Sequence, residues 1–197
     1  MEPTARRFRH VQLEETAASP VRQWLDTLSQ MAIFMVAAIF AFTFVFRIIT
    51  VTGTSMLPNY SEGDRLVISM LSRDYKMGDV VVAVNVLDEP IIKRVIATEG
   101  QTVWIDYESG TVYVDDQPVD ETAFGLENGI TRTLYEYLEA TPLPATVPEG
   151  CVFVLGDNRS VSEDSRYADV GMIDTRNLLG KAVLFVYPFS KFGWIGG

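Results

Sequence analysis

One long apolar segment near the N-terminus constrains this 197-residue chain more than any other feature. Residues 31–46 read MAIFMVAAIFAFTFVF, in which Thr43 has the only polar side chain. With its flanks the segment covers residues 28–50, and at about 1.5 Å per residue such a helix is long enough for the ~30 Å hydrocarbon core of a bilayer. The sequence therefore predicts a transmembrane helix over 28–50.

The charges around this segment predict its orientation. Arg6, Arg7, Arg9 and Arg22 precede it, whereas basic residues are scarce immediately after it. Because basic residues gather on the cytoplasmic side, residues 1–27 are expected in the cytoplasm and residues 51–197 outside it, as a single-pass protein of the cell membrane. Arg47 can extend its head group to the interface.

Two other interpretations of the segment exist. A cleavable signal peptide is disfavoured because the segment is long and no convincing A-x-A site follows it. A buried helix of a soluble protein is disfavoured because the apolar character runs all round. If the segment spans the membrane, the nine residues from Phe46 to Ser55 reach at most about 30 Å, which keeps Ser55 near the membrane surface.

The composition of the remaining chain excludes several functions. Residues 51–197 carry eleven basic and twenty-two acidic side chains, a net charge of −11, which argues against a nucleic-acid partner. The single cysteine, Cys151, allows no intrachain disulfide and is expected to be a buried structural thiol. The single histidine, His10, lies outside the predicted domain, so histidine-based peptidases and histidine-rich zinc sites are excluded unless it reaches the site. No metal or cofactor is expected.

After residue 50 the pattern changes from helical to strand-like, and a mostly β domain of antiparallel sheets is predicted. A turn at 115–117 is expected to form a hairpin, DTRNLLG a short helical turn, and residues 122–150 an irregular surface insertion. The aromatic C-terminal segment YPFSKFGWIGG is expected to close the core, with contact to the lipid interface as the alternative. The expected strands are RLVISML (65–71), DVVVAVNV (79–86), IIKRVIAT (91–98), TVWID (102–106), TVYVD (111–115), CVFVLG (151–156) and KAVLFVY (181–187).

The segment TGTSMLPNYSEGDRLVI, residues 52–68, contains a candidate nucleophile. Ser55 stands at the entrance to a predicted strand, near Gly53, which lets a substrate backbone approach closely. Taken alone this signal is weak, because serines near glycine are common in ordinary turns.

The segment IIKRVIATEG, residues 91–100, contains a candidate general base. Strand alternation places Lys93 on one face with Ile91 and Val95, and Arg94 on the other. An edge-strand lysine that discourages aggregation would give the same pattern. A desolvated amine, by contrast, has a lowered pKa and can accept a hydroxyl proton near neutral pH.

The segment VLGDNRSVSEDSRYADVGMI, residues 154–173, contains three candidate supporting residues. Ser162, Asp164 and Arg166 occupy alternating positions in a loop that could also be a plain polar surface loop with Asx turns. An Asp-Arg pair can brace such a loop by a charge-assisted bond, and a serine hydroxyl can orient a lysine amine.

Together these segments resemble the type I signal peptidases of bacterial membranes, peptidase family S26, over residues 30–80, 91–119 and 151–190. The single N-terminal span and the small size resemble the Gram-positive subgroup. The matching motifs are Ser55-Met56-Leu57-Pro58, Gly78-Asp79-Val80-Val81-Val82, Lys93-Arg94-Val95-Ile96, Gly156-Asp157-Asn158-Arg159, Ser162-Glu163-Asp164-Ser165-Arg166 and the terminal Gly180–Phe189 segment.

The resemblance implies a serine endopeptidase that removes signal peptides from secreted preproteins. It makes Ser55 the nucleophile and Lys93 the general base, with Ser162 holding the amine and Asp164 with Arg166 stabilising the loop. The preprotein would carry small side chains one and three residues before the cut, in shallow apolar pockets. The substrate-binding and oxyanion residues are expected to be Gly53, Met56, Val81 and Val82.

Two departures from the family pattern limit this inference. The turn after the lysine strand is usually Gly-x-Pro-Gly-Asp and is here 97–101, Ala-Thr-Glu-Gly-Gln, which is expected to change shape and leave the chemistry unaltered. Gly53 stands where some members have a serine that helps to bind the oxyanion. The Ser55 N–H then needs a second donor, for which Thr52 and Thr54 are candidates.

Two other functions are alternatives to a signal peptidase. A self-cleaving peptidase with a Ser-Lys dyad is disfavoured, because such enzymes are soluble and this chain has an apolar span. A membrane-anchored β-module that binds exported chains without cutting them is disfavoured, because both dyad residues are present.

Overall fold

A computed structural model describes residues 20–71, 73–132 and 138–196. Residues 1–19 of the predicted cytoplasmic segment, with His10, and residues 133–137 of the predicted insertion lie outside the described part. The chain divides into two compact units, Met1–Phe40 and Ala41–Gly197. Each unit is described by itself below.

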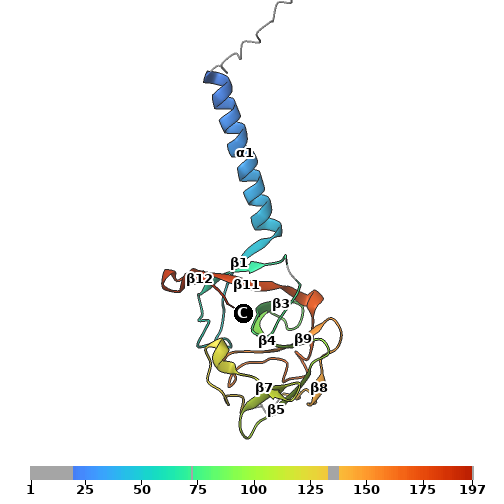
Figure 1. Ribbon diagram of the computed structural model, residues 1–197. Coiled ribbons are helices and arrows are strands. Elements are labelled where there is room, and N and C mark those ends of the chain that lie inside the picture. Colours follow the sequence, from blue (N-terminus) through green and yellow to red (C-terminus); the bar gives the residue numbers. More distant parts are fainter. Residues whose placement is uncertain (1–19, 72, 133–137, 197) are drawn as a thin grey trace, which may run out of the picture. The chain divides into compact units, whose positions relative to one another are not determined.

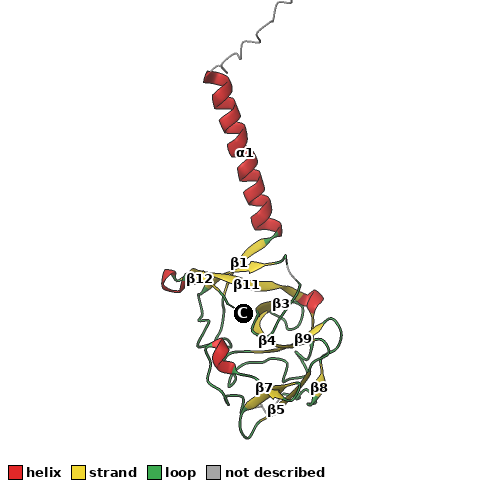
Figure 2. Ribbon diagram, in the orientation of Figure 1, coloured by secondary structure: helices red, strands yellow, loops and turns green. Residues whose placement is uncertain are grey.

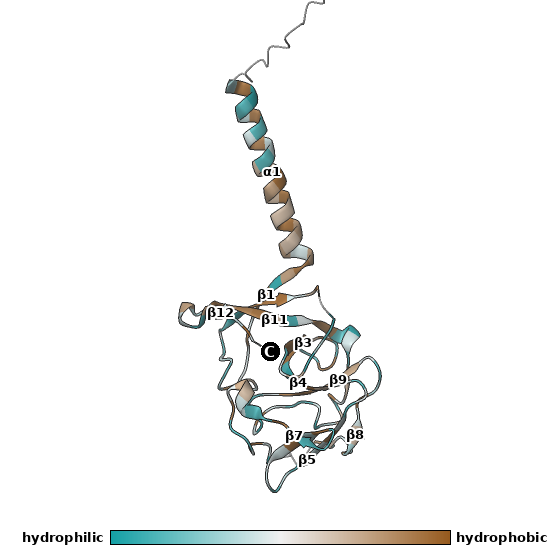
Figure 3. Cartoon of the chain, viewed as in Figure 1, coloured by the Kyte–Doolittle hydropathy of each residue, from teal (hydrophilic) through white to brown (hydrophobic). Residues whose placement is uncertain are grey.

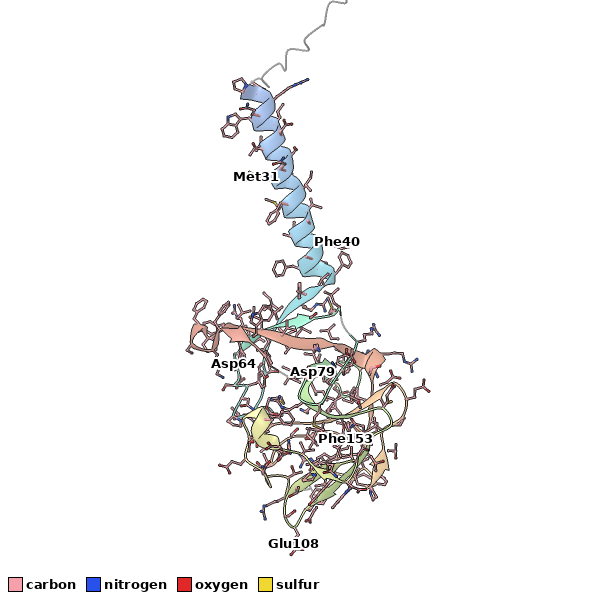
Figure 4. The ribbon with its side chains drawn as sticks, viewed as in Figure 1. Met31, Phe40, Asp64, Asp79, Glu108 and Phe153 are labelled. Carbon is pink, nitrogen blue, oxygen red and sulfur yellow. The ribbon has the colours of Figure 1, made fainter. Side chains whose placement is uncertain are left out.

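The N-terminal helix α1 spans Pro20–Phe44 and buries none of its side chains. Figure 3 shows a more polar first part and an apolar second part, and in Figure 4 the labelled Met31 and Phe40 lie on this helix. By length and composition it could cross a membrane. Proline at its first position suits a helix start, because that N–H has no partner within the helix.

The helix extends beyond the predicted span of 28–50 at its N-terminal end and stops short of it at its C-terminal end. The helix begins at Pro20 and ends at Phe44, and residues Phe46–Thr50 form strand β1. The sequence of β1 is FRIIT, whose two isoleucines and threonine favour an extended backbone. Strand β2, Arg65–Ser69, pairs with β1 along its whole length in antiparallel register.

The predicted mostly β architecture with one N-terminal apolar helix is confirmed (Figure 2). The larger sheet has the strand order β1-β2-β11-β3-β4-β9-β10, with β12 paired to β11, and the smaller has the order β7-β6-β5-β8; all pairs are antiparallel (Figure 1). The remaining strands are β3 (Val80–Ala83), β4 (Ile91–Thr98), β5 (Thr102–Asp106), β6 (Thr111–Val114), β7 (Gln117–Pro118), β8 (Ala145–Thr146), β9 (Cys151–Leu155), β10 (Ile173–Asp174), β11 (Leu178–Tyr187) and β12 (Gly193–Trp194).

Three short 3₁₀ helices complete the fold: η1 (Glu121–Phe124), η2 (Thr175–Asn177) and η3 (Phe189–Lys191). The expected hairpin is present, since β6 pairs with β7 across Asp115 and Asp116, which both have positive φ. The expected helical turn is η2, but the leucines after it already belong to β11. The described residues of 122–150 are largely irregular apart from the end of η1 and β8.

The larger unit, Ala41–Gly197, is called the body. Strand β4 contributes to all three of its apolar clusters. Ile91 and Val95 pack in the cluster that contains Val81 and Val154. On the other face, Ile96 lies in the cluster with Phe153, labelled in Figure 4, and Ile92 packs against the cluster that contains Met56 and Leu66. A strand surrounded on both faces in this way holds its side chains in fixed positions.

The C-terminal aromatics do not close the core as expected. Phe185 and Ile195 pack against the cluster around Met56. Phe189, Phe192 and Trp194, however, are 80%, 62% and 82% exposed. Trp194 stands in the two-residue strand β12, which among the described strands pairs with β11 alone, and Phe189 lies in the short helix η3.

Candidate active site

Ser55 lies in the loop that joins β1 to β2. The loop is closed at its base, where the Val51 N–H donates to the Asp64 carbonyl at 2.8 Å. Val51, Met56 and Tyr60 are buried in one apolar cluster and anchor the loop to the sheet. Because Met56 points into the core, its neighbour Ser55 is left half-buried at the edge of the loop.

Lys93 reaches Ser55 from the middle of β4. Its Nζ lies 3.1 Å from the Ser55 Oγ. The side chain is buried, and strand alternation puts it on the face of Ile91 and Val95, as expected from the sequence. Burial lowers the pKa of the Lys93 amine, while the nearby carboxylates of Asp164 and Glu163 oppose this shift.

This geometry suits proton transfer. A general base must lie within about 2.6–3.2 Å of the group whose proton it takes, and the Ser55–Lys93 distance falls in that range. The amine must also be uncharged, which its buried environment favours. The pair can therefore generate a serine nucleophile without histidine.

The loop after β9 holds the Ser55 segment in place. The Asn158 backbone N–H donates to the Ser55 carbonyl at 3.0 Å, and its side-chain amide donates to the Thr54 carbonyl at 3.1 Å. Gly156 allows this approach, because a Cβ there would lie 2.5 Å from the Ser162 Cβ and 2.6 Å from the Ser55 carbonyl oxygen. Asn158 was missed in the sequence as a site residue, although it stands inside the quoted Gly-Asp-Asn motif.

A buried ion pair ties the same loop to β4. Arg94 Nε and Nη2 donate to the two carboxylate oxygens of Asp157 at 2.8 and 2.6 Å. Asn59, from the Ser55 loop, also donates to Asp157 at 2.8 Å. Arg94 thus faces away from Lys93, as alternation predicted. Asp157, in the loop after β9, is bonded both to the Ser55 loop and to β4. This pair could not be found in the sequence, because its members are 63 residues apart.

Asp164 and Arg166 form a second buried ion pair, with Arg166 Nε 2.8 Å from Asp164 Oδ1. Asp164 Oδ2 also accepts the Gly156 N–H at 3.0 Å. Arg166 donates to the carbonyls of Arg159 and Ser162. This pair therefore braces the whole loop on which Asn158 stands.

Ser162 is fully buried, but its hydroxyl has no hydrogen-bond partner among the described residues. The expected contact between this hydroxyl and the Lys93 amine is therefore not formed. The physical reason lies in packing, since the Ser162 side chain is pressed against the Gly156 backbone.

The predicted pocket residues also lie differently from the expectation. Met56, Val81 and Val82 are 1%, 0% and 4% exposed and belong to the apolar core. The two valines stand on β3, which lies between β11 and β4, and Met56 packs in the same cluster as Val82. Gly53 is exposed and has a φ of 77°. An open cleft of about 490 Å³ lies beside the site instead, with Leu57, Pro58 and Asn158 in its lining.

The described residues contain no group of three or more histidine, cysteine or acidic side chains that could hold a metal ion. Cys151 stands at the start of β9 and is half-buried, not fully buried as expected, because its side chain lies at the margin of an apolar cluster.

Comparison with known proteins finds a family model and relatives that all carry the name signal peptidase. Residues 24–187 match the family described as "Signal peptidase, peptidase S26". The chain is 34% identical to the "Probable signal peptidase I-1" of Synechocystis sp., over 88% of this chain and 89% of that protein. It is 30% identical to "Signal peptidase IB" of Staphylococcus aureus, over 87% and 93%, and 30% identical to "Signal peptidase I" of Bacillus licheniformis, over 90% and 96%. A solved signal peptidase I from Enterococcus faecalis V583 is 29% identical and covers 54% of this chain and 94% of that one, with a TM-score of 0.41.

Proposed function

Because this chain belongs to the signal peptidase family, peptidase S26, we propose that it cleaves signal peptides from secreted preproteins with a Ser55–Lys93 dyad at the outer face of the cell membrane. Membership of the family makes it a serine endopeptidase that acts on signal peptides. The proposal goes further in assigning the two catalytic residues, the membrane anchor and its orientation.

One observation carries the dyad assignment. The Lys93 amine is buried, lies 3.1 Å from the Ser55 hydroxyl, and has a pKa that burial lowers. Neutral Lys93 takes the Ser55 proton as Ser55 attacks the scissile carbonyl. The amine of the mature protein then leaves with a proton, and the signal peptide remains esterified to Ser55. A water molecule deprotonated by Lys93 hydrolyses this ester and releases the signal peptide.

The open edge of β4 offers a path for the substrate. Pairing with β9 covers Arg94–Thr98 only, whereas pairing with β3 covers Ile91–Arg94. Ile91–Lys93 therefore present a β9-side edge that no described strand pairs. An extended preprotein segment that hydrogen bonds to this edge would bring its scissile bond to Ser55.

The membrane assignment rests on three features. Helix α1 is long and apolar enough to span a bilayer, and none of its residues is buried. Arginines precede its apolar part, which favours a cytoplasmic N-terminus. The exposed aromatics Phe189, Phe192 and Trp194 are residue types that favour the membrane–water interface or apolar surroundings.

The dyad is tested by cleavage of a preprotein in detergent. We expect Ser55→Ala and Lys93→Ala each to abolish processing while the folded body is retained, because each removes one member of the proton-transfer pair. Lys76→Ala is the matched control, since the Lys76 side chain is exposed and forms an ion pair with the surface residue Asp74. Full processing by purified Lys93→Ala protein, with the correct cut site, would rule out the dyad.

A further inference from the structure

The cleft beside Asn158 lies next to the Ser55 loop, two residues of which line it. One wall comes from the Ser55 loop and the loop after β9, through Leu57, Pro58 and Asn158. The opposite wall comes from residues 125–130, with Leu126 and Ile130. Asn158 donates its backbone N–H to the Ser55 carbonyl, so this wall lies one hydrogen bond from the nucleophile.

Buried polar contacts hold the two walls in a fixed relation. Arg159 Nη1 donates to Glu121 and, at 2.5 Å, to the Thr131 hydroxyl, while its Nε donates to the Gly156 carbonyl at 2.9 Å. Asn59 Nδ2 bonds the Phe124 carbonyl at 2.8 Å. The segment that forms the far wall is thus attached at both ends to the catalytic loops, which makes the cleft a preformed binding site.

The size of the cleft indicates which part of a substrate it fits. Selection of small side chains before the cut requires shallow pockets, whereas this cleft has a volume of about 490 Å³, in the range of whole ligand sites. The unpaired edge of β4 ends at Lys93, because Arg94 is already paired with Leu155 of β9. A chain that follows this edge leaves the sheet beside the dyad. The cleft lies near this point, because Asn158 lines the cleft and donates to the Ser55 carbonyl.

We propose that this cleft binds the first residues of the mature protein, those that follow the scissile bond, and that Glu127 at its rim selects against acidic side chains there. The proposal rests on the peptidase function proposed above and adds a second part of the substrate to it. The mature side of a preprotein has no fixed sequence, which suits a roomy cleft with mixed lining.

Charge supports the role of Glu127. The Asp157 charge is balanced by Arg94, and the Arg159 charge is balanced by Glu121. Glu127 is exposed and has no ion-pair partner among the described residues, so it leaves one uncompensated negative charge at the cleft. A lysine in the substrate would be attracted to this charge and a glutamate repelled.

The first test compares internally quenched peptides with Ala-x-Ala before the cut and either one or four residues after it. We expect the longer peptide to raise kcat/KM of the full-length enzyme in detergent by about tenfold, the order of one buried apolar side chain. Ile130→Trp, which fills the cleft, should remove most of this gain. Leu71→Trp, at an exposed apolar position that does not line the cleft, should keep it.

The second test uses charge and does not depend on core packing. Peptides with lysine or glutamate at the second mature-side position should differ in kcat/KM by about twofold to fivefold in favour of lysine, the range of an exposed charge pair. Glu127→Lys should reverse the preference.

The outcomes separate the two proposals. Failure of the wild-type enzyme to cut any of the peptides or a preprotein would reject the peptidase function itself. Cleavage without a gain from mature-side residues, or a gain that persists in Ile130→Trp, would overturn the cleft assignment alone. So would an effect of Ile130→Trp confined to residues before the cut, or a charge preference that Glu127→Lys leaves unchanged.

Discussion

Lys93 shows how surroundings can decide the chemistry of a single side chain. In water a lysine amine is charged at neutral pH, with a pKa of about 10.4. Within β4 the same amine is buried, and burial lowers its pKa. As a general base it must be neutral, so activity should be present above the lowered pKa and fall as the pH drops through it.

Gly156 gives a second prediction at the residue scale. Gly156→Ala should lower kcat/KM by about 10²-fold, because the added Cβ would push the Ser55 carbonyl and shift the nucleophile by a fraction of an ångström or more. Gly193→Ala is the matched control, since a Cβ there meets nothing within 4 Å and the backbone is not left-handed. Peptide cleavage assays of the two variants, with circular dichroism to check folding, measure the difference. Equal activity of both variants would contradict the proposed role of this close contact.

The residues of the site differ in how far the sequence could identify them. Ser55 and Lys93 could be proposed because the short motifs around them resemble those of a known family, although each signal alone is weak. The Arg94–Asp157 pair and the Asn158 contacts depend on which loops the fold brings together, and no local pattern contains that information. Met56, Val81 and Val82 are apolar, and apolar residues occur both in pocket walls and in the interior of a core. The sequence alone does not distinguish these two positions.

At the scale of elements, β4 organises the site. Its predicted bounds of 91–98 match the structure, because a β-branched run between a proline and a Glu-Gly turn is a strong strand signal. The end of α1 was harder to predict, since Phe46, Ile48 and Ile49 of β1 continue the apolar sequence of the helix on either side of Arg47. Only the pairing of β1 with β2 separates them, and that partner lies beyond the Ser55 loop.

The ion pair between β4 and the loop after β9 yields a prediction about stability. Arg94→Met should lower the free energy of unfolding of the body by about 3–5 kcal/mol, because it leaves the buried Asp157 carboxylate without its cation. Arg94→Met combined with Asp157→Leu should regain much of that loss, since no buried charge remains. Urea denaturation of both variants measures these differences. Arg176→Met, which breaks an exposed Asp-Arg pair, should change stability little, and a loss as large as that of Arg94→Met would contradict the argument.

At the scale of the molecule, the chain combines an apolar helix with a β body that has its own core. The three apolar clusters draw all of their buried members from residues 51–182, so the body does not need α1 for its packing. The proposed role of α1 is therefore to keep the dyad near the membrane, where preproteins emerge, rather than to build the site.

Removal of residues 1–44 tests this division of roles. The shortened protein should fold and cut a short soluble peptide at a rate within a few-fold of the full chain in detergent. It should lose most of its binding to lipid vesicles and process membrane-inserted preproteins more slowly, because the local concentration provided by the anchor is lost. Vesicle flotation and the two cleavage assays measure these effects. Unfolding of the body, or equal vesicle binding with and without α1, would contradict the assignment.

The central claim is that the Lys93 amine is uncharged at the pH at which the enzyme works, and it can be measured directly. The chain has only four lysines, so labelling their ε-carbons with ¹³C gives four signals that can be followed by NMR as the pH is raised. We predict that the signal absent from Lys93→Met protein titrates clearly below the ordinary lysine value of about 10.4. Titration of that signal at or above the ordinary value would contradict the account.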